Sequence, residues 1–516
     1  MKLKIKLIRL FSQILFFSLF LYLFIKTESR GEDKIGYPVK VFLEFDPFIS
    51  LSTIISTRSL SDISYFFLFT IAATVFFGRI FCGWVCPLGF INDLAGKIGL
   101  RRKEEEKKWF RLKYYLLVGI LTSAIFSVHI SGFFDPISIL VRSFTISIYP
   151  GFVLVLENIF DILYSAELIG DFTEAIYNFF RENVFPFKIQ SFFQSFFVGI
   201  LFFILLGTNL IEKRFWCKYL CPLGALLGFF SFFPLIRKSI SEGCTNCGVC
   251  ELYCSGGLKA IKHSWSVSEC IECYECENVC PKNAISSGKN QKPKKVDLGR
   301  RGVAFAILFG ALFHPLIKVH PLYRERFFSS RLIRPPGALG EPEFLKRCIR
   351  CGECMKVCPT NALQPSFLES GPEGIWTPIL VPKVGYCEFR CTMCGQVCPV
   401  GAIKRLTPEE KIKTKIGLAF IDKNRCLPYA FNRPCIVCEE VCPTPKKAIY
   451  LEEKKILIGK VNIVIKQPRV DPELCVGCGI CEAKCPVSDS PAIYITSIQE
   501  SRSKNNRLFI GNYRSS

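Results

Sequence analysis

Histidine is scarce in this sequence, with four residues in 516, at His129, His263, His314 and His320. There is no Cys-x2-Cys-His motif, so attachment of a c-type haem is excluded. So few histidines also disfavour a b-type haem, which would need two of them in the membrane. Loops of the GxxxxGK[ST] or GxGxxG kind are absent as well, so nucleotide chemistry is not indicated. The histidines are interpreted as structural or interfacial residues, with His129 and His314 as minor candidates for a role near a quinone.

Cysteine, in contrast, is abundant and regularly spaced. The 28 cysteines fall into six quartets and two Cys-x3-Cys-Pro pairs, with none left over. The run from Cys348 to Pro359 has the spacing of a bacterial ferredoxin site for a 4Fe–4S cluster. In such a run three cysteines hold one cluster and the fourth ligates the partner cluster, so quartets occur in pairs. A disulfide scaffold suits small secreted domains, and zinc sites usually show two separated Cys-x2-Cys knuckles. The pattern therefore predicts six 4Fe–4S clusters and an electron-transfer function.

The first two quartets predict one ferredoxin domain with two clusters. The exchange of the fourth cysteine predicts one ligand set of Cys244, Cys247, Cys250 and Cys280, and a second set of Cys270, Cys273, Cys276 and Cys254. Ser255 follows Cys254 where the other quartets have proline.

Four further quartets follow in the last third of the chain. Two have the regular spacing, Cys348, Cys351, Cys354 and Cys358, and Cys475, Cys478, Cys481 and Cys485. Two have a modified first loop, Cys387, Cys391, Cys394 and Cys398, and Cys426, Cys435, Cys438 and Cys442. Spacing does not decide which quartets exchange ligands. The shared modification favours pairing the two inner quartets with each other and the two outer quartets with each other.

Apolar residues concentrate in the first 235 positions. Four stretches, near 8–25, 61–77, 114–133 and 191–211, are long enough to cross ~30 Å of hydrocarbon, and a weaker fifth lies near 302–317. Another run, 151–165, carries Glu157 and Asp161 and is interpreted as a helix outside the bilayer. The expected fold is an α-helical transmembrane bundle of four spans and a fifth, joined to α+β ferredoxin-like domains. The expected divisions are 1–235 (membrane domain), 236–290 (two-cluster ferredoxin), 291–320 (linker and fifth helix) and 321–516 (four-cluster domain).

Basic residues indicate the orientation. The N-terminus and the loop 78–113 are rich in Lys and Arg, which favours the cytoplasm, whereas the loop 134–190 is poor in them. The segment 212–301 then returns to the cytoplasm with the first two cluster sites. This inner-face bias accounts for the net charge of +22, so no nucleic-acid partner is expected.

Two segments are near copies of each other. Arg79-Ile-Phe-Cys82-Gly-Trp-Val-Cys86-Pro-Leu-Gly89 and Arg214-Phe-Trp-Cys217-Lys-Tyr-Leu-Cys221-Pro-Leu-Gly224 each follow an expected span. Cysteines four residues apart share one face of a helix. The four thiols are candidates for a further metal centre, for redox-active dithiols, or for structural thiols at a helix end.

At this point the chain resembles two known families in sequence. Residues 1–290, with the repeated Cys-x3-Cys-Pro-Leu-Gly motifs and the Cys244 to Cys280 sites, resemble the NapH-type membrane ferredoxins of periplasmic nitrate reductase systems and their MauN relatives. Residues 296–516 resemble the NapG and MauM ferredoxin-type proteins. That second match rests on Arg300-Arg301, on Arg334-Pro-Pro-Gly-Ala-Leu and on Arg347-Cys348-Ile-Arg-Cys351-Gly-Glu-Cys354.

The resemblance implies electron transfer from the quinol pool to a periplasmic redox partner or reductase. It also implies that Arg300-Arg301 and the helix after them act as a twin-arginine export signal that stays as an anchor. We then expect a multi-pass protein of the bacterial inner membrane with its C-terminal domain in the periplasm. The alternatives are a maturation factor for another redox enzyme, or an electron carrier with all clusters in the cytoplasm.

Overall fold

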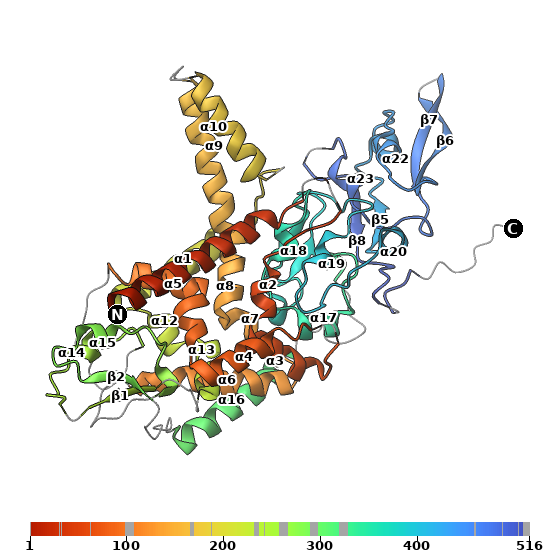
Figure 1. Ribbon diagram of the computed structural model, residues 1–516. Helices are drawn as coiled ribbons and strands as arrows, with labels where there is room; N and C mark the ends of the chain where they lie inside the picture. Colours follow the sequence, from red (N-terminus) through yellow and green to blue (C-terminus); the bar gives the residue numbers. More distant parts are fainter. Residues whose placement is uncertain are drawn as a thin grey trace.

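A computed structural model describes residues 2–508, apart from residues 30, 32, 62, 99–107, 166–169, 187, 232–236, 242, 257–266, 289–297, 319–328, 459–460, 488 and 504. Figure 1 shows a helical bundle with a small ferredoxin-like domain at one end and a larger domain, from the last third of the chain, at the other. His263 and His320 fall outside the described residues.

Helix α1 (Lys2–Lys26) connects the two ends of the bundle. Its 25 residues extend for ~37 Å at 1.5 Å per residue, enough to cross a hydrocarbon core of ~30 Å. Near its start, Arg9 Nε donates a hydrogen bond of 3.1 Å to Gly83 O, beside the first ferredoxin domain. Near its end, the ring of Phe24 lies 5.0 Å from Lys356 Nζ of the larger domain. The two cysteine-rich domains therefore lie at opposite ends of one long apolar helix.

Most of the remaining helices of the bundle are short. Within the described ranges, three helical segments are long and apolar enough to cross a membrane, namely Ile5–Lys26, Pro136–Tyr164 and Arg300–Ile317. The expected spans 61–77, 114–133 and 191–211 correspond to shorter apolar helices, α4 (Phe67–Phe77), α6 (Leu112–Ile125) and α11 (Ser195–Ile211). The other helical elements of this part are α2 (Lys40–Glu44), α3 (Pro47–Thr57), η1 (Phe81–Val85), α5 (Pro87–Ala95), η2 (Lys108–Arg111), α7 (Ser131–Phe134), α12 (Phe215–Tyr219) and α13 (Pro222–Phe230).

The segment 136–165 differs in part from its expectation. The run 151–165 is not isolated, because α8 (Pro136–Ser143), η3 (Phe144–Ile148) and α9 (Tyr149–Ser165) follow one another as one helical stretch. The first part is buried, whereas Asp161 lies on an exposed half. Figure 1 shows α9 and α10 (Gly170–Asn183) projecting from the bundle, across the direction of α1 and α16.

The expected fifth helix is present as α16 (Arg300–Lys318) and packs along α6. Gly302 lies against Tyr115, and Gly310 lies against Gly119 and Thr122. Further along, the Nδ1 atom of His314 is 2.7 Å from Phe126 O. The contacts advance together along both helices, so α16 runs in the same direction as α6, from the first ferredoxin domain towards the larger domain.

The first ferredoxin domain is built from short elements. Its strands β1 (Arg237–Ile240) and β2 (Ile285–Gly288) pair antiparallel, with Arg237 opposite Gly288 and Ile240 opposite Ile285. The helical elements are α14 (Val249–Leu252), η4 (Val267–Glu269) and α15 (Glu275–Val279). The domain contacts the bundle where the backbone of Ile271 closely approaches Gly83, which has no side chain to obstruct it.

In its described residues, the larger domain contains three two-stranded antiparallel sheets, β3–β4, β5–β8 and β6–β7. Strands β6 and β7 form a hairpin between the last two quartets and pair from Ile449 with Val470 to Ile458 with Val461. The elements are α17 (Glu341–Arg347), α18 (Glu353–Lys356), β3 (Leu363–Pro365), η6 (Pro372–Gly374), β4 (Pro378–Leu380), α19 (Met393–Gln396), α20 (Pro408–Lys413), β5 (Leu418–Ile421), α21 (Leu427–Ala430), α22 (Val437–Glu440), β6 (Ile449–Ile458), β7 (Val461–Val470), α23 (Ile480–Ala483) and β8 (Ile493–Thr496).

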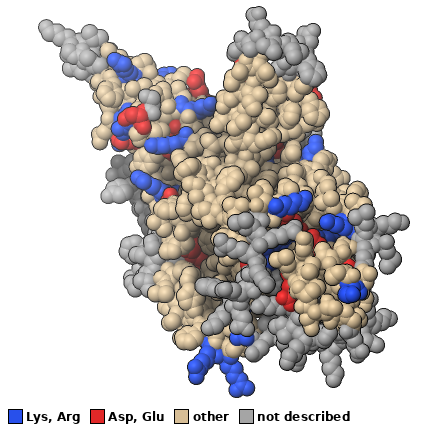
Figure 2. All heavy atoms as spheres, turned by 90° about the vertical axis from the view of Figure 1, so that its left-hand side faces the viewer, with Lys and Arg blue, Asp and Glu red and all other residues tan. Residues whose placement is uncertain are grey.

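The surface of the bundle is largely free of charge. Figure 2 shows a broad area without Lys, Arg, Asp or Glu beside the charged side chains of the first ferredoxin domain. Large apolar side chains of α4 and α11, such as Phe69, Phe196 and Phe203, are mostly exposed. Such a surface is unfavourable in water and compatible with a membrane location.

Candidate iron–sulfur sites and a four-thiol site

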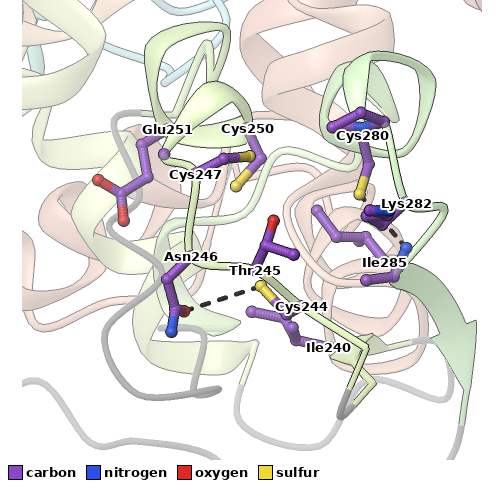
Figure 3. Close-up of a pocket in the computed structure, with 13 residues that line it drawn as sticks. Ile240, Cys244, Thr245, Asn246, Cys247, Cys250, Glu251, Cys280, Lys282 and Ile285 are labelled. Carbon is purple, nitrogen blue, oxygen red and sulfur yellow. Dashed lines mark hydrogen bonds between the residues drawn. The ribbon is translucent and has the colours of Figure 1, made fainter.

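The first quartet forms an open pocket with a thiol from the second. Cys244, Cys247 and Cys250 line one side of this pocket and Cys280 faces them from the turn after α15 (Figure 3). Cys247 is exposed and the other three thiols are half-buried. This grouping is the one expected from the exchange of the fourth cysteine.

The second pocket of this domain is lined by Cys254, Cys270, Cys273 and Cys276. Lys238 is buried beside it, with Nζ 3.3 Å from the centre of the Tyr274 ring and 2.8 Å from Glu277 Oε1. The two short helices α14 and α15 contact each other between the pockets. Ser255, which replaces the usual proline, does not prevent Cys254 from reaching this pocket.

In the larger domain, neighbouring quartets exchange their fourth cysteines. One pocket is lined by Cys348, Cys351, Cys354 and Cys398, and the next by Cys387, Cys391, Cys394 and Cys358. The helices α18 and α19 contact each other between these pockets. The interpretation that outer quartets pair with outer and inner with inner is therefore wrong.

The last two quartets behave in the same way. Burial, and then the electrostatic interaction with Cys485, raise the pKa of Cys438 to about 12, so these two thiols lie close together. Cys442 lies close to Cys475 and Cys481 from the other side of the pair. Helices α22 and α23 contact each other here. The residues inserted between Cys426 and Cys435 form α21. The insertion therefore lies between two ligands of one quartet and does not separate the neighbouring quartets.

The chemistry of these pockets fits iron–sulfur clusters. Each brings together four cysteines, which is the donor set of a 4Fe–4S cluster. Among the described residues, no three His, Cys, Asp or Glu side chains are placed to hold a single metal ion. Burial raises the pKa of thiols such as Cys391 and Cys478 to about 12. They are therefore protonated at neutral pH until a metal displaces the protons.

The repeated Cys-x3-Cys-Pro motifs also meet in space. Cys86 and Cys221 each lie close enough to Cys82 and Cys217 for electrostatic interaction. Cys86 and Cys221 precede the short helices α5 and α13, whose first residue is proline. The positive ends of two helix dipoles therefore point at one group of four thiols. Burial is the largest effect on Cys86 and Cys221, and it raises their pKa.

An arginine from each motif crosses to the other motif. Arg214 Nη1 donates to Cys82 O at 3.0 Å, and Nη2 donates to Gly89 O at 3.2 Å. A Cβ atom on Gly224 would lie 2.6 Å from Arg79 Nη2, so only glycine leaves room for that guanidinium. Arg214 also adopts a left-handed backbone conformation, with φ of 59°. The repeated Gly and Arg of the two motifs thus form one pseudo-symmetric site.

Acidic side chains balance these arginines. Asp93 accepts hydrogen bonds from Arg214 at 2.6 Å and from Arg9 at 2.6 Å. Burial would raise the pKa of Asp93, but the attraction of Arg214 and Arg9 prevails and holds it well below its usual range. Glu269, next to Cys270, accepts from Arg79 at 2.9 Å and from Tyr114 at 2.7 Å. Glu269 therefore links the four-thiol site to the second cluster pocket.

At the other end of the bundle the structure groups His129, which the sequence analysis named, with acidic side chains that it missed. Asp46 and Asp135 are fully buried, and their carboxyl groups face each other. Arg350, which lies between Cys348 and Cys351 in the sequence, donates a hydrogen bond of 2.7 Å to His129 O. The His129 ring contacts Ser131 at 2.8 Å and Ser52 at 3.2 Å. The signal was visible in the sequence as a repeated tripeptide, Phe45-Asp46-Pro47 and Phe134-Asp135-Pro136.

Comparisons with protein families agree with this arrangement. A model of a 4Fe-4S binding domain matches residues 63–108, 194–240 and 393–417, and another matches 468–488. A 4Fe-4S dicluster model matches residues 347–402, the range of the two quartets that share pockets here. A second dicluster model matches 269–363 and so combines cysteines that the structure places at opposite ends of the bundle. The fold and these sites define an iron–sulfur electron-transfer protein of the ferredoxin type.

Curated relatives give the family. The chain is 37% identical over 165 residues to a methylamine utilization ferredoxin-type protein MauM of Methylophilus methylotrophus, covering 31% of this chain and 70% of that protein. It is 38% identical over 170 residues to the ferredoxin-type protein NapG of Escherichia coli, covering 32% of this chain and 71% of that protein. An uncharacterized protein of Methanocaldococcus jannaschii is 26% identical over 226 residues, covering 42% of this chain and 74% of that protein. The chain belongs to the NapG/MauM family of ferredoxin-type proteins. No solved structure matches it.

Proposed function

We propose that this protein takes electrons from membrane quinol and delivers them to a redox partner in the periplasm through six 4Fe–4S clusters. The cysteine pockets described above are the cluster sites, each with three cysteines of one quartet and one of its neighbour. When bound, the clusters supply one-electron carriers. The membrane half is the NapH-like part of the chain, and the larger domain is the NapG/MauM-like part.

The observation that carries this proposal is the position of the two sets of pockets at opposite ends of α1. A helix of ~37 Å that ends in a cysteine-rich domain on each side is the arrangement needed to place one set on each face of a bilayer. Helix α16, parallel to α6, gives the chain its return path between the two ends. The exposed twin arginine, Arg300 and Arg301, begins this helix. That position supports export of the larger domain.

The four-thiol site extends the route into the bundle. The ion pair between Arg79 and Glu269 connects this site to the second cluster pocket. The site consists of Cys82, Cys86, Cys217 and Cys221. Two buried guanidiniums and two helix N-termini offset the negative charge of a thiolate-bound centre. We therefore assign these thiols to a further iron–sulfur centre. Redox-active dithiols, which would suit a maturation factor, are the alternative.

Quinol chemistry is tested with purified protein under anaerobic conditions. Addition of a quinol analogue should bleach the visible absorbance of the clusters, as dithionite does. Absorbance that responds to dithionite and not to any quinol analogue would favour the maturation role instead.

The side of the membrane on which the larger domain lies is tested with reporter proteins fused after Ser516. A periplasmic reporter should be active with the native sequence and inactive when Arg300→Lys and Arg301→Lys are combined. A reporter active only in the cytoplasm would make all clusters cytoplasmic.

A further inference from the structure

Asp46 and Asp135 form a carboxyl pair at the end of the bundle that faces the larger domain. Asp46 precedes α3 and Asp135 precedes α8, each between a phenylalanine and a proline. Both side chains are 0% exposed. Their pseudo-symmetric origin parallels that of the four thiols at the opposite end.

The hydrogen bonds of the pair imply one shared proton. Asp46 Oδ1 accepts from the backbone N of Phe48 at 2.8 Å and of Ile49 at 3.2 Å. Asp135 Oδ2 accepts from Ser138 N at 2.6 Å. The other oxygens, Asp46 Oδ2 and Asp135 Oδ1, have no donor among the described residues. Two facing carboxylates cannot both be ionised in a buried site, so a proton lies between them.

The charges around the pair agree with this state. Burial, and then the charge of Asp135, raise the pKa of Asp46 well above its usual range. Arg142 of α8 is close enough to interact electrostatically with both Asp135 and Cys351. Arg142 Nη1 also donates a hydrogen bond of 3.3 Å to Arg350 O. His129 is neutral, since burial and Arg350 lower its pKa to about 3.

Helix α2 contacts α3 and α8 and carries two further charged residues, Lys40 and Glu44. Glu353 of α18 lies close enough to interact with both of them. Lys40 and Glu44 pair with each other at 3.5 Å. The guanidinium of Arg142, which interacts with both Asp135 and Cys351, therefore connects the carboxyl pair electrostatically to a cysteine of the larger domain.

We propose that the Asp46–Asp135 pair accepts the protons released when quinol gives its electrons to the pocket of Cys348, Cys351, Cys354 and Cys398. The inference rests on the proposed quinol oxidation. Oxidation of one quinol to quinone breaks two O–H bonds and releases two electrons and two protons. The electrons pass to the cluster site. The pair, which holds one proton, takes a second with each electron and releases it to the outer solution before the next electron leaves.

The substitutions Asp46→Asn and Asp135→Asn each remove one carboxyl group that can take up a proton and keep a side chain that can cap the helix. Asparagine caps a helix about as well as aspartate, so the hydrogen bonds to Phe48, Ile49 and Ser138 can persist while the titratable group is lost. Asp422→Asn is the matched control, because Asp422 also accepts a backbone hydrogen bond, from Asn424 N at 3.0 Å, in the larger domain.

The first readout is the rate of cluster reduction by a quinol analogue in the full-length, cluster-loaded protein. We expect each pair variant to slow this rate by about a hundredfold, with full reduction by dithionite, and the control to be unchanged. Rates equal to those of the native protein would overturn the proposal and leave the pair as helix caps.

The second readout does not depend on quinol, and its decisive measurement, on the native protein, does not depend on how well the variants fold. Infrared difference spectra of the native protein, reduced with dithionite, should show a protonated-carboxyl band that shifts in D2O and is missing in both pair variants. Absence of such a band in the native protein would overturn the proposal, even if quinol reduces the clusters. A band without reduction by quinol would keep the proton-accepting pair and refute quinol as the electron donor.

Discussion

Arg214 donates a hydrogen bond of 3.0 Å to the carbonyl oxygen of Cys82, although 132 residues separate them in the chain. The same guanidinium is held by Asp93 and is almost fully buried. A charge is rarely buried in this way without a partner. The contact joins the two Cys-x3-Cys-Pro motifs into one site, which makes a metal centre between them testable.

Cys82→Ala should remove this centre. If the four thiols hold an iron–sulfur cluster, anaerobically purified protein should lose about four iron atoms per chain. Iron is measured against protein concentration, and Phe81→Leu serves as a neighbouring buried control. Native iron content in the variant would exclude an iron–sulfur centre at these thiols.

Gly224→Ala should disturb the same site without touching a thiol. Its Cβ would lie 2.6 Å from Arg79 Nη2, so the arginine must move away from Cys221. Overpacking of this kind costs about 1–3 kcal/mol, which should lower the midpoint of thermal unfolding. Gly207→Ala on α11 is the control, because a Cβ there meets nothing within 4 Å. An equal midpoint for both variants would show that Gly224 is not required for the approach of Arg79.

Exchange of ligands between neighbouring quartets makes a prediction about paramagnetic spectra. Cys351→Ser and Cys398→Ser should alter the same cluster signal, because both line one pocket. Cys358→Ser should alter the signal that Cys391→Ser also changes. Electron paramagnetic resonance of the partly reduced variants distinguishes these sets. A common change in Cys351→Ser and Cys358→Ser, with none in Cys398→Ser, would require a different pairing.

An ion pair in the larger domain predicts a dependence of stability on pH. Arg334 and Arg502 hold Glu341 at 2.5 and 2.6 Å, and although burial would raise its pKa, their attraction lowers it to about 2. An unfolded glutamate has a pKa of ~4.3, so this stabilisation is present above that pH and is lost as the pH falls towards 2.

Glu341→Gln should therefore destabilise the protein by about 3 kcal/mol at pH 7. The gap in thermal midpoint between native and variant protein should be constant from pH 8 to pH 6 and should narrow near pH 4. A gap that widens as the pH falls would contradict the assigned role of Glu341. Glu409→Gln, on an exposed position of α20, is the control.

Cysteine spacing was sufficient to predict the cluster sites of the first ferredoxin domain. A Cys-x2-Cys-x2-Cys loop fixes three thiols locally, and in that domain only one neighbouring quartet can supply the fourth. In the larger domain four quartets are available, and their pairing depends on which short helices contact one another. The modified first loops of the two inner quartets suggested that these quartets pair with each other, but the residues inserted after Cys426 form α21 and leave the pairing of neighbours unchanged.

The sites at the ends of the bundle were harder to predict for a different reason. Arg79, Arg214 and the two glycines could be recognised as a repeat, but their crossing contacts depend on how two pairs of helices are placed. Asp46 and Asp135 lay in a repeated tripeptide that is too short to stand out beside the cysteines. Their separation in the chain concealed a contact that arises only when α3 and α8 begin at the same level of the bundle.

The most direct test of the account is the iron and acid-labile sulfide content of full-length protein purified without oxygen. Six filled 4Fe–4S sites require about two dozen iron atoms per chain, and a cluster at the four-thiol site adds about four more, with an equal amount of sulfide and a brown colour. Colourless protein with only a few iron atoms, after expression under conditions that load other iron–sulfur proteins, would contradict it.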